Sequence, residues 1–187
     1  MNITPDDYQL WSTATAIYPN RGVPAGLPYL ALGFCGEAAE LMRTVGGPPS
    51  NAGAGGLVET EAGDVLWHIA QLHTCAGIYL DAFDGWEIED DVTIPSEWSP
   101  ADTLVLEAGR VAKIAKKLLR DGQGVLRGQL EVDLREALRS SFLSWLWWVQ
   151  ECGPRYGVDA EGVAAANLRK LSSRLRRGKL GGSGDRR

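Results

Sequence analysis

The stretch LALGFCGEAAEL at residues 30–41 decides the class of the fold. Its apolar residues recur every three or four positions, which is the period of an amphipathic helix and not of a strand. The stretch TEAGDVLWHIA at residues 60–70 has the same character. Glycine and proline at residues 46–49, and Gly77 further on, bound the two segments. We therefore expect helices over about residues 30–44 and 57–76 that pair as an antiparallel hairpin.

The rest of the chain continues in the same way. Helix-start signals or helical periodicity predict further helices over about residues 5–16, 100–120, 132–152 and 159–177. No segment shows the sustained alternation of a strand. We therefore expect an all-α protein with a single domain over residues 1–187.

An internal repeat relates the two halves of the chain. The stretch TLVLEAGRVAKI at residues 103–114 lies over residues 30–41, and SWLWWV at residues 144–149 lies over DVLWHI at residues 64–69. The match predicts two similar hairpins that form a four-helix bundle with pseudo-two-fold symmetry. Shared helical periodicity is the alternative explanation. The predicted division is a metal-bearing half at residues 1–80, a linker at 81–99, a degenerate half at 100–177 and a flexible tail at 178–187.

The halves differ at four acidic positions. The first half has Glu37, Glu40, Glu61 and Asp64, and the second half has Arg110, Lys113, Ser141 and Ser144 at the aligned positions. One half therefore keeps a set of carboxylates that its twin has lost. We expect a pseudo-dimer in one chain with one working centre, and further pairing into a homodimer stays open.

The spacing of the carboxylates indicates a metal site. Glu37 and Glu40 are three residues apart on one predicted helix, and Glu61 and Asp64 repeat that spacing on the next. A hairpin can bring these oxygens together, which suits Mg²⁺, with Mn²⁺ as a substitute. A solvated acidic face is the plainer interpretation. A di-metal redox centre usually takes Glu-x-x-His pairs, and neither His68 nor His73 has a glutamate three residues earlier.

Charge and composition narrow the class of protein. The chain has a net charge of −5, with 14 Asp/Glu against two Arg in residues 1–100 and ten Asp/Glu against 17 Lys/Arg in residues 101–187. An acidic half suits a cation and a basic half suits phosphate. We expect a cytoplasmic protein, because the three cysteines lack the paired spacing of metal ligands, which suits a reducing compartment, and because the start lacks a secretion signal. We expect no membrane span and no nucleic-acid partner.

These residues together resemble the MazG-like nucleotide pyrophosphohydrolases, the all-α NTP pyrophosphatase superfamily. The matching pieces are YQ (8–9), AIYP (16–19), GEAAE (36–40), EAGDVLW (61–67), NLRKLSSR (167–174) and the tail RGKLGGSGD (177–185). The resemblance implies that the four carboxylates hold Mg²⁺ and that Glu37 or Glu40 acts on a water. The substrate would be a nucleoside triphosphate, and the products a nucleoside monophosphate and diphosphate, in control of the nucleotide pool.

The resemblance also implies which residues contact the substrate. Asn167, Lys170 and Arg174 match the family's phosphate or nucleotide contacts. The family often continues its first motif helix with paired lysines, whereas this chain has MRTV at residues 42–45. Lys113 and Lys117 in the second half are predicted to supply phosphate contacts across the pseudo-symmetry axis. The alternative functions are a non-catalytic nucleotide-binding regulator that keeps the metal site and a structural helical protein.

Overall fold

The computed structural model describes residues 3–46, 54–80, 85–88, 98–121 and 126–180, and these ranges contain helices and no strand. The α-helices are α1 (Pro5–Thr13), α2 (Leu27–Val45), α3 (Ala54–Ala76), α4 (Pro100–Asp121), α5 (Gln129–Cys152) and α6 (Ala160–Arg176). Short 3₁₀ helices, η1 (Pro24–Gly26) and η3 (Gly153–Tyr156), precede α2 and follow α5. The prediction of an all-α fold is confirmed. Within the described ranges, no helix combines the length and apolar content that crossing a bilayer requires.

The start of α1 matches the sequence signal, whereas two other boundaries differ from it. The Thr4 hydroxyl accepts from the Asp7 amide at 3.1 Å, and the Asp7 carboxylate accepts from the Thr4 amide at 3.2 Å, a capping box. Helix α1 ends at Thr13, earlier than predicted. Helix α2 begins at Leu27, three residues before the predicted start, with Pro28 in its first turn. Proline is tolerated there because the first helical amides have no partner within the helix.

Two hairpins form the main bundle. Helices α2 and α3 pair, α4 and α5 pair, and the hairpins meet through α2 against α4 and α3 against α5. Among the hydrogen bonds that join the hairpins, the Trp145 indole donates to the carbonyl of Ala62 at 2.9 Å, and the Cys35 thiol donates to the carbonyl of Ala108 at 3.4 Å. Trp145 and Trp148 are fully buried in the shared core. This arrangement suits a duplicated hairpin, and the duplication itself stays a prediction.

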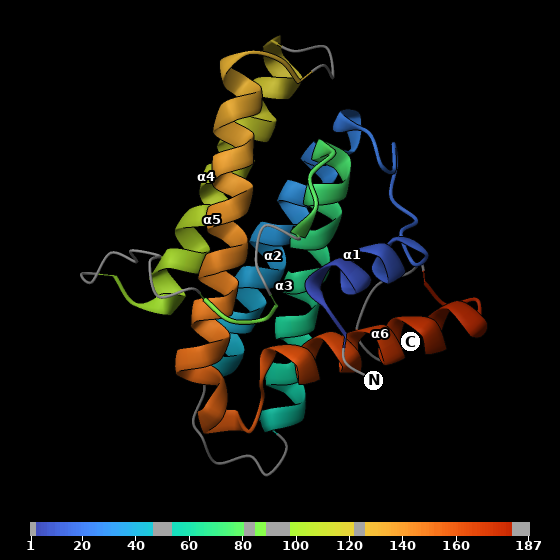
Figure 1. Cartoon of the computed structure of the whole chain (residues 1–187), viewed down its shortest axis with the longest axis vertical. Coiled ribbons are helices and arrows are strands. Elements are labelled where there is room, and N and C mark those ends of the chain that lie inside the picture. Colours follow the sequence, from blue (N-terminus) through green and yellow to red (C-terminus); the bar gives the residue numbers. More distant parts are fainter. Residues whose placement is uncertain (1–2, 47–53, 81–84, 89–97, 122–125, 181–187) are drawn as a thin grey trace.

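Helices α1 and α6 lie across the same side of α3. Figure 1 shows them, in blue and red, running transverse to the long bundle helices. Tyr8 of α1 donates a hydrogen bond to the side-chain oxygen of Asn167 in α6 at 2.8 Å. Gln9 ties α1 to the end of α3, because its amide donates to the carbonyl of Ile78 at 2.8 Å and accepts from the Leu80 amide at 2.8 Å. The first hairpin is therefore covered by elements from both ends of the chain.

The segment predicted as a linker contains a packed tryptophan. Trp86 lies 6.0 Å from Trp145 and 6.3 Å from both Tyr8 and Phe142, measured between ring centroids. Its indole donates to the carbonyl of Ile3 at 2.5 Å. Trp86 and Ile88 thus pack against the core as partly buried residues, while most of the predicted linker at 81–99 lies outside the described residues. The same is true of the predicted tail beyond Leu180.

Candidate metal and nucleotide site

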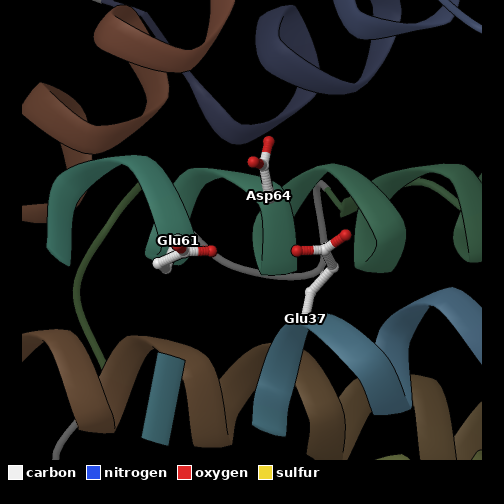
Figure 2. Close-up of side chains that lie close together, drawn as sticks. All are labelled: Glu37, Glu61 and Asp64. Carbon is white, nitrogen blue, oxygen red and sulfur yellow. The ribbon is translucent and has the colours of Figure 1, made fainter. Parts of the chain in front are cut away.

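Three carboxylates, one from α2 and two from α3, lie close together. Glu37 comes from α2, and Glu61 and Asp64 come from α3, where their spacing of three residues places them on one face. One oxygen of each lies within 4.8 Å of an oxygen of the other two. Figure 2 shows Glu37 reaching from α2 toward the helix that carries Glu61 and Asp64. Carboxylate oxygens so placed are the donors that a hard divalent cation prefers.

The surroundings of these carboxylates make their combined charge unfavourable. Glu61 is only 5% exposed. Burial, together with the neighbouring carboxylates of Asp64, Glu40 and Glu61, raises the pKa of Glu37 to about 7, and Lys170 opposes this rise. Without a cation, the cluster therefore relieves part of its repulsion by keeping a proton near neutral pH. The chemistry of the donor set fits a divalent cation, which would replace that proton.

Glu40 lies outside this cluster. It is one turn further along α2 and its side chain is exposed, although it is close enough to raise the pKa of Glu37. The three-residue spacing keeps Glu40 on the same side of α2 as Glu37, but about 4.5 Å further along the helix axis. The structure thus gathers three of the four predicted carboxylates in one cluster and leaves Glu40 outside it.

Helix α6 brings two further predicted residues to Asp64. The amide nitrogen of Asn167 donates to Asp64 Oδ1 at 3.2 Å, and Lys170 Nζ lies 2.6 Å from the same oxygen. Asn167 is only 2% exposed, and the bond from Tyr8 to its oxygen fixes which way its amide faces. A Cβ added at Gly63 would lie 2.8 Å from Asn167. Glycine at this position therefore permits α6 to approach α3 closely enough to reach Asp64.

An open cavity of about 590 Å³ adjoins the carboxylates. Glu37 and Asp64 lie at its edge, and Arg174 lines it from α6. The remaining lining is largely apolar or aromatic: Thr15, Ile17, Tyr18, Tyr29, Leu32, Gly33, Trp67, His68, Leu171 and Leu180. The cavity therefore combines an anionic edge, a guanidinium group and an aromatic wall, and it is large enough for a small organic ligand.

The aromatic wall was not foreseen as part of a site. Tyr18 and Tyr29 stack with ring centroids 5.9 Å apart. The Trp67 indole donates to the hydroxyl of Thr15 at 3.1 Å, which holds the ring in place. The Nδ1 of His68 donates to the backbone carbonyl of Asp64 at 3.1 Å, and the ring packs against Gly33. The members of this wall are far apart in the sequence. The sequence signals that included any of them were therefore AIYP at residues 16–19 and the tryptophan of the EAGDVLW motif.

The lysines of the second half lie elsewhere. Lys117 faces Asp133 of α5 at 3.9 Å, and Lys113 is exposed on α4. Neither lines the cavity beside Asp64. The positive groups that the structure does place there, Lys170 and Arg174, both come from α6. The described contacts thus give no support to phosphate binding by α4.

Comparison with known proteins gives one informative similarity. The chain is 39% identical over 84 residues to the Gene 37 protein of Mycobacterium phage L5, a match that spans 45% of this chain and 70% of that protein. The name of that protein states no activity. No protein-family model matches the chain, and no solved structure matches it.

Proposed function

The chain belongs to the family of the Gene 37 protein of Mycobacterium phage L5, and we propose that it is a Mg²⁺-dependent, MazG-like nucleoside triphosphate pyrophosphohydrolase. The observation that supports this function best is the meeting of three carboxylates with Lys170 at the edge of an aromatic-walled cavity. The reaction is (d)NTP + H₂O → (d)NMP + diphosphate, and Mn²⁺ can substitute for Mg²⁺.

The two ends of the cavity suit the two ends of a nucleotide. Glu37, Glu61 and Asp64 would hold the cation, and the positive groups of Lys170 and Arg174 would bind the triphosphate. The base lies toward the aromatic wall, where Tyr29 and Trp67 offer ring surfaces for stacking. The ribose has no obvious specific partner among the lining residues, so the proposal covers both ribonucleotides and deoxyribonucleotides.

The carboxylates divide the chemical work. A bound Mg²⁺ would supply charge neutralisation for phosphate oxygens and would make a neighbouring water more acidic. Glu40, which is exposed and lies outside the cluster of three, would orient the attacking water and take its proton. The water attacks the α-phosphorus, the bond to the bridging oxygen breaks, and diphosphate leaves with the bridging electrons. Asn167 keeps Asp64 in place throughout, because its own amide is fixed by Tyr8.

A panel of nucleotides tests this function. Purified protein is incubated with each canonical NTP and dNTP and Mg²⁺, and diphosphate and monophosphate are measured. Turnover of at least one nucleotide is expected, with loss of turnover in Glu61→Gln and in Glu40→Gln. Glu61→Gln should also lose Mn²⁺ binding, whereas Glu40→Gln should keep it. Glu136→Gln, which changes an exposed carboxylate on α5, is the matched control. Absence of diphosphate with every nucleotide removes the proposal of an enzyme.

The position of Glu40 also favours a second candidate, a nucleotide-binding regulator that keeps the metal site. A cation can be held by the three clustered carboxylates without any group that activates water. This function predicts that calorimetry detects tight binding of Mg²⁺ and a nucleotide, while chromatography detects no product. The same panel of nucleotides therefore separates the two candidates.

A further inference from the structure

The ammonium group of Lys170 already occupies part of the candidate cation site. Its Nζ is 2.6 Å from Asp64 Oδ1, and the two side chains are 19% and 17% exposed. An ion pair so withdrawn from water is much stronger than a surface pair. Asp64 is therefore neutralised by the protein itself when no metal is present.

We infer that Lys170 is an internal counter-ion that closes the site to free divalent cations, so that the site accepts a cation together with a polyphosphate. This inference rests on the proposed function and specifies its ligand as the cation–polyphosphate complex. Lys170 acts here as a positioning residue, since it changes which ligand Asp64 can hold.

Repulsion between cations is the first step of the argument. A divalent cation held by Glu37, Glu61 and Asp64 would share the Asp64 carboxylate with an ammonium group. Two positive charges on one carboxylate repel each other strongly where water is scarce. The cation alone must therefore displace Lys170, which would leave the ammonium in a largely buried position without its carboxylate.

A polyphosphate removes this obstacle. Arg174 lies one turn beyond Lys170 on α6 and lines the cavity, so both side chains belong to the face that a phosphate chain would meet. The four-carbon stem of lysine allows its ammonium to turn from Asp64 to a phosphate oxygen. The incoming polyphosphate thus supplies a new partner for Lys170 and further oxygen ligands for the cation.

Binding of the two ligands is then positively coupled. The polyphosphate strengthens cation binding by drawing Lys170 away, and by thermodynamic linkage the cation strengthens polyphosphate binding by the same factor. A purely structural ion pair makes the opposite prediction. In that case, loss of Lys170 would lower stability and weaken cation binding or leave it unchanged.

Titration with Mn²⁺ alone tests the inference, with free Mn²⁺ measured by electron paramagnetic resonance. Relative to the wild-type chain, Lys170→Met should bind Mn²⁺ about tenfold more tightly or better, because a nearby repelling charge is gone. Lys170→Arg should stay close to wild type. Lys113→Met is the matched control, since it removes the same charge from an exposed position on α4 that does not line the cavity.

Coupling is measured in the same proteins by adding inorganic triphosphate or a nucleotide analogue with a methylene bridge between the α and β phosphates. The wild-type chain should bind Mn²⁺ at least about tenfold more tightly with the analogue than without it, and Lys170→Met should lose most of that gain. If Lys170→Met fails to fold by circular dichroism, Lys170→Gln, which keeps a polar group, replaces it in both titrations.

The outcomes separate this inference from the proposed function. Equal Mn²⁺ affinity in Lys170→Met and Lys113→Met, in a chain that still hydrolyses nucleotides, overturns the counter-ion role alone. Absence of Mn²⁺ binding in every variant, with no hydrolysis, removes the metal site and this inference together. Tighter binding in Lys170→Met with loss of coupling supports both.

Discussion

The first hairpin, α2 and α3, and the second hairpin, α4 and α5, have the same design and treat their polar positions differently. Arg110, aligned with Glu37, pairs with Glu136 at 3.0 Å, and Ser141, aligned with Glu61, donates to the carbonyl of Ala137 at 2.7 Å. The second hairpin thus satisfies these groups within itself. In the first hairpin the aligned carboxylates face one another and draw Lys170 in from α6. Within the described residues, the first hairpin thus takes a partner for Asp64 from a helix outside the pair, whereas the second hairpin pairs Arg110 and Ser141 internally.

The hairpins also differ in how closely they allow a neighbour to approach. Gly33 and Gly63 in the first hairpin contact His68 and Asn167, and a Cβ at either position would collide with that partner. The aligned positions in the second hairpin are Leu106, which is half exposed, and Leu143. Gly33 therefore leaves room for His68 of α3 within the first hairpin, and Gly63 leaves room for Asn167 of α6, which docks on that hairpin. The second hairpin carries bulky side chains at the same places.

Replacing acidic residues of the first hairpin by the aligned residues of the second hairpin should have the largest effect on turnover. Glu61→Ser and Asp64→Ser each reproduce the residue of the second hairpin, and each removes a ligand and a negative charge. We expect nucleotide turnover to fall by about a thousandfold or more. The measurement is diphosphate release at saturating Mg²⁺. Glu131→Ser on α5, an exposed change of the same kind, should keep wild-type turnover; equal losses in both proteins would contradict the assignment.

Adding a methyl group at Gly63, where α6 approaches α3 closely, should have the next largest effect on turnover. Gly63→Ala pushes Asn167 and α6 away from Asp64, and we expect turnover to fall by about a hundredfold. Overpacking should lower the free energy of unfolding by about 1–3 kcal/mol. Gly109→Ala on α4 is the control, because no atom lies within 4 Å of its added Cβ, and it should be neutral or stabilising. Urea unfolding and diphosphate release measure both; unchanged values for Gly63→Ala would contradict the packing argument.

The pH dependence of stability should show a smaller effect of the clustered acids. The pKa of Glu37 is raised to about 7 in the folded chain, from its ordinary value of 4.5, so the folded state binds the extra proton. Its contribution to stability is full below about pH 4.5 and is lost as pH rises to about 7. Allowing for solvent screening, we expect a loss of about 1 kcal/mol or more.

Comparison with Glu37→Gln isolates this contribution. The buried His73 has its pKa lowered to about 4, so it destabilises the fold as pH falls below about 6.5, in both proteins alike. Urea unfolding without divalent cations at pH 5 and pH 7.5 gives the difference between wild type and variant. The difference should favour wild type more at pH 5, and Mn²⁺ binding to wild type should tighten as pH rises through 7. A difference that does not change with pH would contradict the titration of Glu37.

Removing the positive charge of Arg110, the residue aligned with Glu37, should have the smallest effect. Arg110 is 40% exposed and its partner Glu136 is 67% exposed, and exposed pairs contribute about 0–1 kcal/mol. Arg110→Gln should therefore change the unfolding free energy by less than about 1 kcal/mol and leave turnover unchanged. Thermal unfolding and the diphosphate assay measure this. A large loss of activity would mean that the second hairpin takes part in the site.

Local signals in the sequence predicted the helices and part of the site. The capping residues at Thr4 and the glycine and proline breaks predicted the helix starts and ends to within a few residues, because these signals act over a single turn. The spacing of Glu61 and Asp64 predicted their shared face for the same reason. Glu40 shows the limit of spacing, since a residue on the same helix face can still lie one turn too far along the axis to join the cluster.

Contacts between distant segments could not be predicted in this way. The docking of α6 on α3, and with it the pairing of Lys170 with Asp64, depends on Gly63 leaving room for Asn167. The packing of Trp86 among Tyr8 and Trp145 is likewise a tertiary contact within a segment whose composition suggested a linker. Helical periodicity identifies a buried face and leaves its partner undetermined.

The hydrogen bond between Tyr8 and Asn167 joins residues 159 positions apart. During translation, the hairpin with the carboxylates leaves the ribosome long before α6 is made, and contacts across such separations form slowly. The nascent chain therefore contains Glu37, Glu61 and Asp64 before α6, which contacts Asp64, has been made. Under the proposed function, activity would arise only after α6 has been made, and a protein shortened before Asn167 would lack the contact that orients Asp64.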